Sequence, residues 1–360
     1  MLNILWASKT GNANSWYHIA PFRECGLVDK IHVVRYKKPK RVINDIVYHT
    51  FPSTNKFLET LYYIINIVKL LFTKQIDLVV AFNPYPWGLI SFFLGKLFRK
   101  PVLLGLIGGE LDSSRTGKFK RKLLYQVLKR VEIITVTGGD TKQYLSDINI
   151  KQDKVFVFPH LVDANYLNEV KNSQGRSNII TITSFLPVKR TEDAIKAFAL
   201  LLKQGLNLKM IILGDGPGRD NCLNLVKSLG VDDNIKFEGY VNDIRPYINN
   251  SEYYLQTSSS EGLSIALIES MATGLIPLVT NVGDEKEIIK DNETGFFIPV
   301  GEPEIIAEKI AMLESSPLKN AVKENIKKTM VKSTIKSSDK YITEILQSVN
   351  RIRNYEKHRR

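Results

Sequence analysis

Short apolar runs alternate with longer stretches of mixed polar and apolar residues along most of the chain. In the first half, the apolar runs lie at 2–8, 30–36, 76–82, 101–107 and 132–137. Short, largely apolar runs of this length, separated by helical segments, are typical of parallel strands that are covered on both faces. The first half is therefore predicted to be an α/β domain, in which a strand, a polar turn and a helix from Trp16 open the chain.

The second half repeats this alternation after a polar tract at 163–177. Its expected strands lie at 179–185, 208–216, 235–241, 253–258, 276–281 and 294–300, and its expected helices at 191–204, 218–229 and 265–273. This pattern predicts a second doubly wound parallel sheet. We therefore expect an N-terminal domain over 1–165, a second domain over 166–330, and a basic C-terminal helix over 331–360 that packs back on the N-terminal domain.

The composition agrees with two globular domains. The chain has 360 residues, of which 44% are apolar and 24% are charged, so it can bury two cores. Its two cysteines, Cys25 and Cys222, match no metal-ligand spacing, and the start of the chain lacks the features of a signal peptide. No apolar stretch reaches about 18 residues without a charge, so no transmembrane span is predicted. A cytoplasmic location is expected.

The net charge of +13 is unevenly distributed along the chain. Residues 1–165 carry 24 Lys+Arg and 12 Asp+Glu (+12), residues 166–317 carry 14 and 21 (−7), and residues 318–360 carry 12 and 4 (+8). The positive charge is divided between two regions, and no nucleic-acid recognition motif accompanies it. Nucleic acid is therefore not expected as a partner.

Aromatic and basic residues are interleaved in one part of the basic first half. They are Trp87, Phe92, Phe93, Lys96, Arg99 and Lys100. This combination indicates a peripheral face for an anionic membrane surface, which would place the protein at the inner face of the cell membrane. The alternative is a buried helix with a basic end.

The segment 253–289 carries the pattern of a ligand site. An apolar strand runs into a turn of serines and glycine, and Ser264 can cap the helix that follows. Three backbone amides at the helix start would favour a phosphate, namely those of Ser264, Ile265 and Ala266. The carboxylates of Glu261 and Glu269 could accept hydrogen bonds from sugar hydroxyls. Together these groups indicate a nucleotide-sugar, and the alternative is two glutamates that only favour the helix dipole or face solvent.

The same segment resembles the signature of glycosyltransferase family 4, in which E-G precedes a helix that carries E-A-M-A-x-G-x-P-V. The corresponding positions here are Glu261, Gly262, Glu269, Gly274 and Pro277. The resemblance implies a retaining, nucleotide-sugar-dependent enzyme of GT-B fold, α/β, with two doubly wound Rossmann-like domains facing each other across a cleft. It further implies that Glu261 is catalytic beside the donor sugar and pyrophosphate, and that Glu269 binds the ribose hydroxyls. Gly262 and Leu263 would line the donor site.

The segment "SFLPVKRTEDAIKAF" extends the resemblance upstream. It is similar to the family's G-R-L-x-x-x-K-G stretch, and the resemblance makes Lys189 the lysine that neutralises the donor diphosphate. A point charge on a flexible stem suits that task. The family's arginine falls on Ser184, and Arg190 is the candidate to replace it.

Two further segments of the second half resemble the same family. "IILGDGPGRD" is similar to its G-x-G-P-x-R turn, which places Gly214 at the donor site. "IKFEGYVNDI" is similar to its F-x-G-x-V strand and loop, which places the backbone of Tyr240 and Val241 against the base.

The first half resembles the family more weakly. The turn "KTGNANS" lies where the family has a glycine-rich loop, so Gly11 and Asn12 are candidates for contact with the donor phosphates and the acceptor; a bland turn is the alternative. In "LIGGELDSS", Ile107 stands where many relatives have a histidine. Any proton relay would therefore use Glu110, Asp112 or the substrate itself.

Taken together, these features predict retaining transfer of a sugar from a UDP- or GDP-sugar to a carbohydrate or polyprenyl-diphosphate-linked acceptor. The resemblance places this activity in bacterial surface polysaccharide biosynthesis, such as capsule, exopolysaccharide or O-antigen. No metal or other cofactor is expected, because the family needs none and no Asp-x-Asp motif is present.

Two other interpretations stay open. The chain could be a non-catalytic GT-B subunit of a glycosyltransferase complex, because the usual histidine and arginine are missing. It could also be a dinucleotide-dependent oxidoreductase, because Gly214 and Gly216 imitate a dinucleotide fingerprint and Asp233 stands near the spacing of a ribose-binding acid. Arg219 stands where that fingerprint has its third glycine, which weakens this second interpretation.

Overall fold

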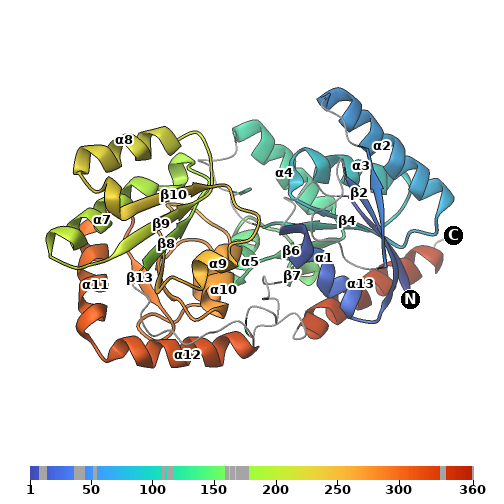
Figure 1. Ribbon diagram of the computed structural model, residues 1–360. Coiled ribbons are helices and arrows are strands. Elements are labelled where there is room, and N and C mark those ends of the chain that lie inside the picture. The colour runs from blue at the N-terminus through green and yellow to red at the C-terminus, as the bar shows by residue number, and fades with distance from the viewer. Residues whose placement is uncertain are drawn as a thin grey trace. The chain divides into compact units, whose positions relative to one another are not determined.

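The chain folds into two compact α/β units. A computed structural model describes residues 1–7, 14–35, 45–51, 55–107, 110–111, 117–158, 162, 167, 178–332 and 338–358. Unit 1 comprises Met1–His160 and Ile335–Arg360, and unit 2 comprises Leu161–Thr334. Each unit is built on its own parallel sheet (Figure 1). The predicted fold class, with two doubly wound α/β domains, is confirmed.

The sheet of unit 1 has the strand order β3-β2-β1-β4-β5-β6-β7, and every neighbouring pair is parallel. The strands are β1 (Leu2–Trp6), β2 (Val28–Arg35), β3 (Ile46–Thr50), β4 (Leu78–Phe82), β5 (Val102–Gly105), β6 (Ile133–Val136) and β7 (Val155–Val157). Strand β1 lies between β2 and β4, which is the arrangement of a doubly wound sheet. Strands β3 and β7 lie outside the apolar runs given above for the first half.

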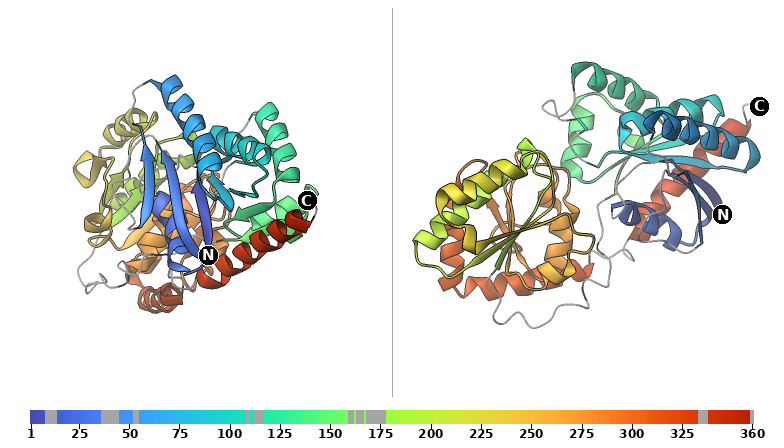
Figure 2. Two further views of the ribbon diagram at one scale, coloured as in Figure 1. Left: turned by 90° about the vertical axis from the view of Figure 1, so that its right-hand side faces the viewer. Right: turned by 45° about the horizontal axis from the view of Figure 1, so that its top comes forward.

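Helices cover both faces of the unit 1 sheet. The helices are α1 (Asn14–Glu24), α2 (Lys56–Thr73), α3 (Leu89–Leu97), α4 (Lys118–Arg130), α5 (Gly139–Asp147) and α13 (Asp339–His358), with short helical turns η1 (Pro84–Gly88) and η2 (Gln152–Lys154). Alternate side chains of the strands point to opposite faces. Leu5 therefore joins the core under α2 to α5, while Ile4 and Trp6 join the core under α1 and α13. The ribbon views show the helices on both sides of the sheet (Figure 2).

The C-terminal helix α13 is part of unit 1, although it follows unit 2 in the sequence. Its apolar stripe, Ile342, Ile345, Leu346 and Val349, is fully buried in the core shared with α1 and the sheet. Its Arg353 also forms an ion pair of 2.7 Å with Asp77. Within the described ranges, no helix is both long enough and apolar enough to cross a membrane.

The sheet of unit 2 has the order β10-β9-β8-β11-β12-β13, again with every pair parallel. The strands are β8 (Asn178–Ile182), β9 (Lys209–Leu213), β10 (Ile235–Gly239), β11 (Tyr253–Gln256), β12 (Ile276–Thr280) and β13 (Phe296–Ile298). The helices are α7 (Thr191–Lys203), α8 (Arg219–Leu229), α9 (Arg245–Ile248), α10 (Ile265–Ala272), α11 (Pro303–Ser315) and α12 (Leu318–Lys332), with turns η3 (Pro187–Lys189), η4 (Asp232–Asn234) and η5 (Glu285–Glu287). Strands β8 and β11 are neighbours at the point where the strand order reverses.

Candidate functional site

The strand order of unit 2 identifies one end of its sheet as the place for a ligand. The chain winds from β8 to β9 and β10 on one side, and from β11 to β12 and β13 on the other. In open parallel sheets, ligands bind beyond the carboxyl ends of the strands at such a reversal, because the loops that follow the two central strands diverge there. The loops after β8 and β11 contain Lys189 and Glu261.

Hydrogen bonds fasten these two loops to each other. The Thr257 hydroxyl donates to the carbonyl oxygens of Lys189 (3.1 Å) and Arg190 (2.8 Å). The Ser259 amide donates to the carbonyl oxygen of Val188 (2.7 Å). The backbone that carries Lys189 is therefore held in place by the serine and threonine residues that follow β11.

Lys189 and Glu261 meet at this point. The Lys189 ammonium forms an ion pair with the Glu261 carboxylate, and the Ser258 hydroxyl donates a hydrogen bond of 2.7 Å to the same oxygen, Oε1. The two side chains are only 22% and 10% exposed. A partly desolvated ammonium beside a carboxylate interacts more strongly with a charged ligand than it would in open water.

Helix α10 begins beside this pair. Ser264 is its N-cap, and the Ser264 hydroxyl accepts a hydrogen bond of 3.3 Å from the Leu267 amide. The first intrahelical bond runs from the Ile268 amide to the Ser264 carbonyl oxygen. The amides of Ile265 and Ala266 come before the first donor of the helix and have no acceptor within it. They need an acceptor from outside the helix, and an anion is favoured there.

Glu269 lies one turn further along α10 and is half-buried. Burial raises the pKa of the fully buried Tyr254 phenol, and the nearby charges of Glu285, Glu261 and Glu269 raise it further. The structure therefore brings the two predicted glutamates close to the same phenol, together with a third carboxyl that the sequence analysis did not select.

That third carboxyl belongs to Glu285, which is fully buried in η5. Its Oε1 accepts a hydrogen bond of 2.9 Å from the Gln256 side-chain amide, whose oxygen in turn accepts from Tyr254 (2.9 Å). Burial, with a further contribution from the charge of Glu261, raises the pKa of Glu285 to about 8, although Gln256, the Ser264 amide and Lys189 oppose the rise. Glu285 is therefore protonated at neutral pH, and it lies next to the Ser264 amide that was expected to face a phosphate.

The raised pKa of Glu285 makes stability depend on pH. An unfolded glutamate ionises near pH 4.5, whereas the folded carboxyl keeps its proton up to about pH 8. Stability is therefore expected to fall by roughly 3 to 5 kcal/mol as pH rises through this window and to level off above it. In thermal melts from pH 5 to pH 8.5, the difference in melting temperature between Glu285→Gln and the wild type is expected to shift in favour of Glu285→Gln as pH rises.

The exposed Glu293 provides a matched control for this prediction. Glu293→Gln removes one carboxylate from the same unit without changing a buried group, so its melting temperature should follow the wild-type pH profile. Parallel profiles for wild type and Glu285→Gln would contradict a buried, protonated Glu285.

The loop that contains Glu285 also packs closely on the loop after β11. A Cβ atom added to Gly283 would lie 2.5 Å from the carbonyl oxygens of both Glu261 and Gly262. The Asp284 amide donates to the Gly262 carbonyl oxygen (3.0 Å). Gly262 and Leu263 are buried under this contact, so they shape the backbone beside Glu261.

Gly214 has a packing role at the same end of the sheet. Its φ is +120°, and a Cβ atom there would lie 1.7 Å from the Thr183 carbonyl oxygen. A Cβ atom at Gly216 would lie 1.8 Å from the carbonyl oxygen of Ser184. Gly214 and Gly216 therefore allow the loop after β9 to lie directly on the loop that carries Lys189. This packing explains the two glycines without a bound dinucleotide.

Tyr240 and Val241 follow the end of β10. The Tyr240 side chain is 69% exposed, whereas Val241 packs partly against the core of unit 2. The Gly214 amide donates to the Gly239 carbonyl oxygen (2.7 Å), so the end of β10 joins the same set of loops. The predicted donor-binding segments of unit 2 thus gather at one end of its sheet.

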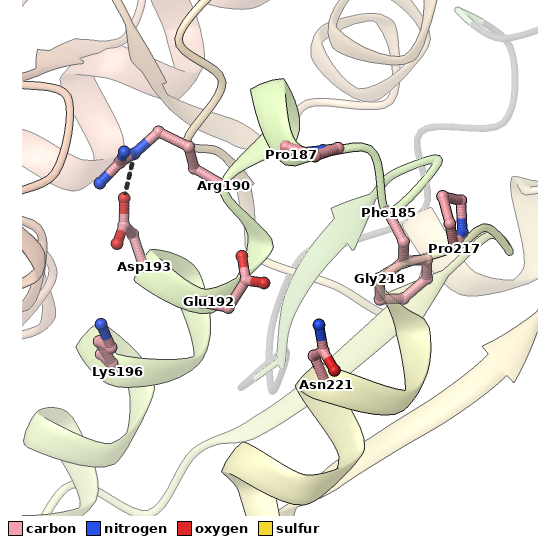
Figure 3. Close-up of a pocket in the computed structure, with 9 residues that line it drawn as sticks. All are labelled: Phe185, Pro187, Arg190, Glu192, Asp193, Lys196, Pro217, Gly218 and Asn221. Atoms are coloured by element: carbon pink, nitrogen blue, oxygen red, sulfur yellow. Dashed lines mark hydrogen bonds and ion pairs between the residues drawn. The ribbon is translucent and has the colours of Figure 1, made fainter.

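Arg190 is paired with a carboxylate of its own helix start. Its Nε donates to the Asp193 carboxylate (2.6 Å), and Figure 3 shows the guanidinium turned toward Asp193. It lines a cavity of about 430 Å³ at the starts of α7 and α8. The cavity residues are Phe185, Pro187, Arg190, Glu192, Asp193, Lys196, Pro217, Gly218 and Asn221. Lys189 and Glu261 are not among them. The contact of Arg190 with the donor diphosphate stays a prediction.

Of the first-half residues predicted to contact the phosphates or acceptor or to relay a proton, Glu110 is described. The Ile107 amide donates to the Glu110 carboxylate (3.2 Å), so this side chain turns back toward the end of β5. Gly11, Asn12 and Asp112 lie outside the described residues. Within the described part of the chain, no three histidine, cysteine or acidic side chains come together as a metal site.

Both halves of the chain match family profiles. Residues 26–166 match the profile described as Glycosyltransferase Family 4, and residues 164–329 match the profile described as Glycosyl transferases group 1. The two matches together run through both units.

Individual relatives point the same way. The chain is 31% identical over 141 residues to N-acetyl-alpha-D-glucosaminyl L-malate synthase of Bacillus anthracis, covering 39% of this chain and 37% of that protein. It is 30% identical over 220 residues to the lipopolysaccharide core biosynthesis glycosyltransferase LpsE of Rhizobium meliloti (strain 1021), covering 60% and 63%. In both cases, less than two thirds of the relative's length is matched.

A solved structure has the same fold. Alr3699/HepE of Anabaena, in complex with UDP-glucose, superposes with a TM-score of 0.81 over 97% of this chain and 100% of that chain, at 16% sequence identity.

Proposed function

Because the chain belongs to the glycosyltransferases of family 4 type with a GT-B fold, we propose that it transfers a sugar from a UDP- or GDP-sugar to a carbohydrate or lipid-linked acceptor. The observation that carries this proposal is the Lys189–Glu261 ion pair beside the start of α10. It combines a cation, free helix amides and a carboxylate in loops that a parallel sheet uses for ligands.

Each group has a role in the proposed reaction. The diphosphate of the donor lies at the amides of Ile265 and Ala266, where Lys189 neutralises the charge that develops as the bond to the sugar breaks. Glu261 orients the sugar through its hydroxyls, and Glu269 binds the ribose. This is electrostatic catalysis by groups that are already in place before the donor arrives.

Retention of the anomeric configuration is part of the proposal, and its support is the family resemblance of the Glu261 to Glu269 segment. A role in bacterial surface polysaccharide biosynthesis is supported by similarity to LpsE. UDP is the first nucleotide to test, because the Anabaena protein of the same fold was crystallised with UDP-glucose.

Thermal melts with a panel of nucleotides and nucleotide-sugars test the proposal. A donor at a hundred times its Kd should stabilise the protein by about 2.7 kcal/mol, which corresponds to a rise of roughly 5 to 10 °C in the melting temperature of a unit of this size. Glu269→Ala should lose most of that rise, whereas Glu293→Ala, on the surface of the same unit, should keep it.

Other outcomes would replace the proposal. Stabilisation by NADH with none by any UDP or GDP compound would indicate a dinucleotide enzyme. If no nucleotide stabilises the protein and it co-purifies with a partner transferase, it would be a non-catalytic subunit.

A further inference from the structure

The exposed aromatic side chains of unit 1 differ from those that the sequence indicated. Phe92 is only 4% exposed and belongs to the core under α2 to α5. Trp87 is half-buried, with its ring centroid 4.3 Å from that of Tyr63. Of the three aromatic residues in the predicted peripheral face, only Phe93 is exposed. The prediction is therefore wrong for Phe92, whereas Phe93 is exposed and Trp87 is partly accessible.

Helix α2 presents apolar side chains on both of its sides. Tyr63, Ile67, Leu70 and Leu71 are buried against the sheet. Its exposed apolar side chains are Phe57, Leu58, Leu61, Ile65 and Phe72, of which Phe57 and Phe72 are 73% and 76% exposed. Residues 58, 61, 65 and 72 recur at helical spacing, so they form one stripe. A helix on the surface of a soluble domain normally has polar residues there.

The stripe continues onto the neighbouring helices. Helix α3 contacts both α2 and α4, and the three helices lie on the same face of the sheet (Figures 1 and 2). The Phe72 ring packs edge-on against Phe98 at the end of α3, with centroids 4.7 Å apart. Leu97 is 73% exposed, and Phe119 at the start of α4 is 81% exposed. We call Phe57, Leu58, Leu61, Ile65, Phe72, Phe93, Leu97 and Phe119 the apolar patch.

Basic residues accompany the apolar patch. Between residues 56 and 130 the sequence has 13 Lys+Arg and 4 Asp+Glu, a net charge of +9. Described exposed cations on or next to the three helices are Lys56, Lys69, Lys74, Arg99, Lys118, Lys120, Lys122, Lys129 and Arg130. Lys96 is bound by Glu132 and does not count among them.

From this arrangement we propose that the apolar patch of unit 1 docks on a bilayer that contains anionic lipids. The phenylalanine and leucine side chains enter the boundary between headgroups and acyl chains, and the surrounding lysines and arginines bind the lipid phosphates. A second copy of the chain fits this surface poorly, because it would place two strongly positive patches against each other. The occupant is therefore a lipid surface, which does not depend on the identity of the sugar donor.

Sedimentation with vesicles tests this inference on the full-length protein. We expect binding to vesicles that contain about one third phosphatidylglycerol, much weaker binding to phosphatidylcholine alone, and weakening of the anionic binding at high salt. The double variant Phe72→Ser/Leu97→Ser should bind the anionic vesicles about ten- to a hundredfold more weakly. Lys118→Glu/Lys122→Glu should lose the preference for anionic lipid.

Matched controls come from unit 2, where Met312 and Val331 are 44% and 59% exposed. Met312→Ser/Val331→Ser should bind vesicles as the wild type does. All variants should stay folded in thermal melts because the changed side chains are largely exposed. Phe72→Ser/Leu97→Ser should show a small drop in melting temperature, because it also removes the contact of Phe72 with Phe98. Absence of binding to both vesicle types would overturn the inference. The inference would also be overturned if the Phe72→Ser/Leu97→Ser variant bound anionic vesicles as strongly as the wild type. A dimer in solution that this variant abolishes, without vesicle binding, would assign the patch to self-association instead.

Discussion

Replacement of Lys189 by methionine is expected to lower kcat/KM for sugar transfer about 100- to 1,000-fold while the fold stays intact. Methionine keeps most of the length of the side chain and removes the charge. The Lys189 ammonium lies in the loop after β8, only 22% exposed, and contacts the Glu261 carboxylate. A cation placed there before the reaction stabilises the departing diphosphate without reorganising water, and removal of one such group costs about 3 to 4 kcal/mol in the transition state.

Glu261→Gln is expected to cause a loss of similar size. The glutamine keeps the shape of the side chain and can still accept a hydrogen bond from Ser258, so the change removes the charge and little else. Because Lys189 and Glu261 touch, their effects are not independent, and the double variant should be little worse than either single one. Initial rates with the donor found in the thermal melts measure all three.

Lys236 provides the matched control for this experiment. It also belongs to unit 2 and also forms an ion pair, with Glu238, but its side chain is 73% exposed. Exposed pairs contribute little, so Lys236→Met should stay within about twofold of the wild-type rate. If Lys189→Met retains wild-type activity, or if the two methionine variants lose equal activity, the role given to Lys189 is wrong.

The sequence predicted the regular elements of unit 2 closely. Helices expected at 191–204, 218–229 and 265–273 are found at Thr191–Lys203, Arg219–Leu229 and Ile265–Ala272. These helices have clear limits in the sequence, such as the serine cap at 264 and the glycine that ends α8. Strand β3 was missed because it is an edge strand that directly follows a strongly polar tract, so no long apolar run marks it.

The contacts that assemble the site could be predicted only in part. The motifs identified Lys189 and Glu261 but did not predict that the two form an ion pair. They are 72 residues apart in the sequence, and the pairing of β8 with β11 brings their loops together. Glu285 was missed because a glutamate in a polar stretch is normally exposed. Its burial depends on Gln256 and on the loop packing around Gly283.

The same limit applies to the surface of unit 1. Periodicity predicts which residues of a helix face a core, but α2 is apolar on both sides, so its pattern alone could not separate Ile67, which is buried, from Ile65, which is 53% exposed. The face of α2 that packs on the sheet determines which of its apolar residues are buried, and this packing depends on the tertiary fold.

Gly214→Ala is expected to destabilise unit 2 by about 3 to 5 kcal/mol, a drop of roughly 10 °C in its melting temperature. At φ +120° an alanine is strained in any surroundings, and its Cβ would lie 1.7 Å from the Thr183 carbonyl oxygen. To relieve the clash, the loops after β8 and β9 must move apart. This movement is opposed by two hydrogen bonds, one from the Thr183 amide to the Leu213 carbonyl oxygen (2.9 Å) and one from the Gly214 amide to the Gly239 carbonyl oxygen (2.7 Å).

Gly230→Ala separates the clash from the general cost of replacing a glycine. Gly230 ends α8 with φ +67°, and nothing lies within 4 Å of a Cβ atom added there, so this variant should lose only about 1 kcal/mol. Thermal and urea unfolding of both variants measure the difference. Equal losses would show that the close approach at Thr183 carries no energy. Because the displaced loop also carries Lys189, any Gly214→Ala protein that remains folded should be stabilised less by the donor than Gly230→Ala is, which links the packing of these glycines to the geometry of the proposed diphosphate site.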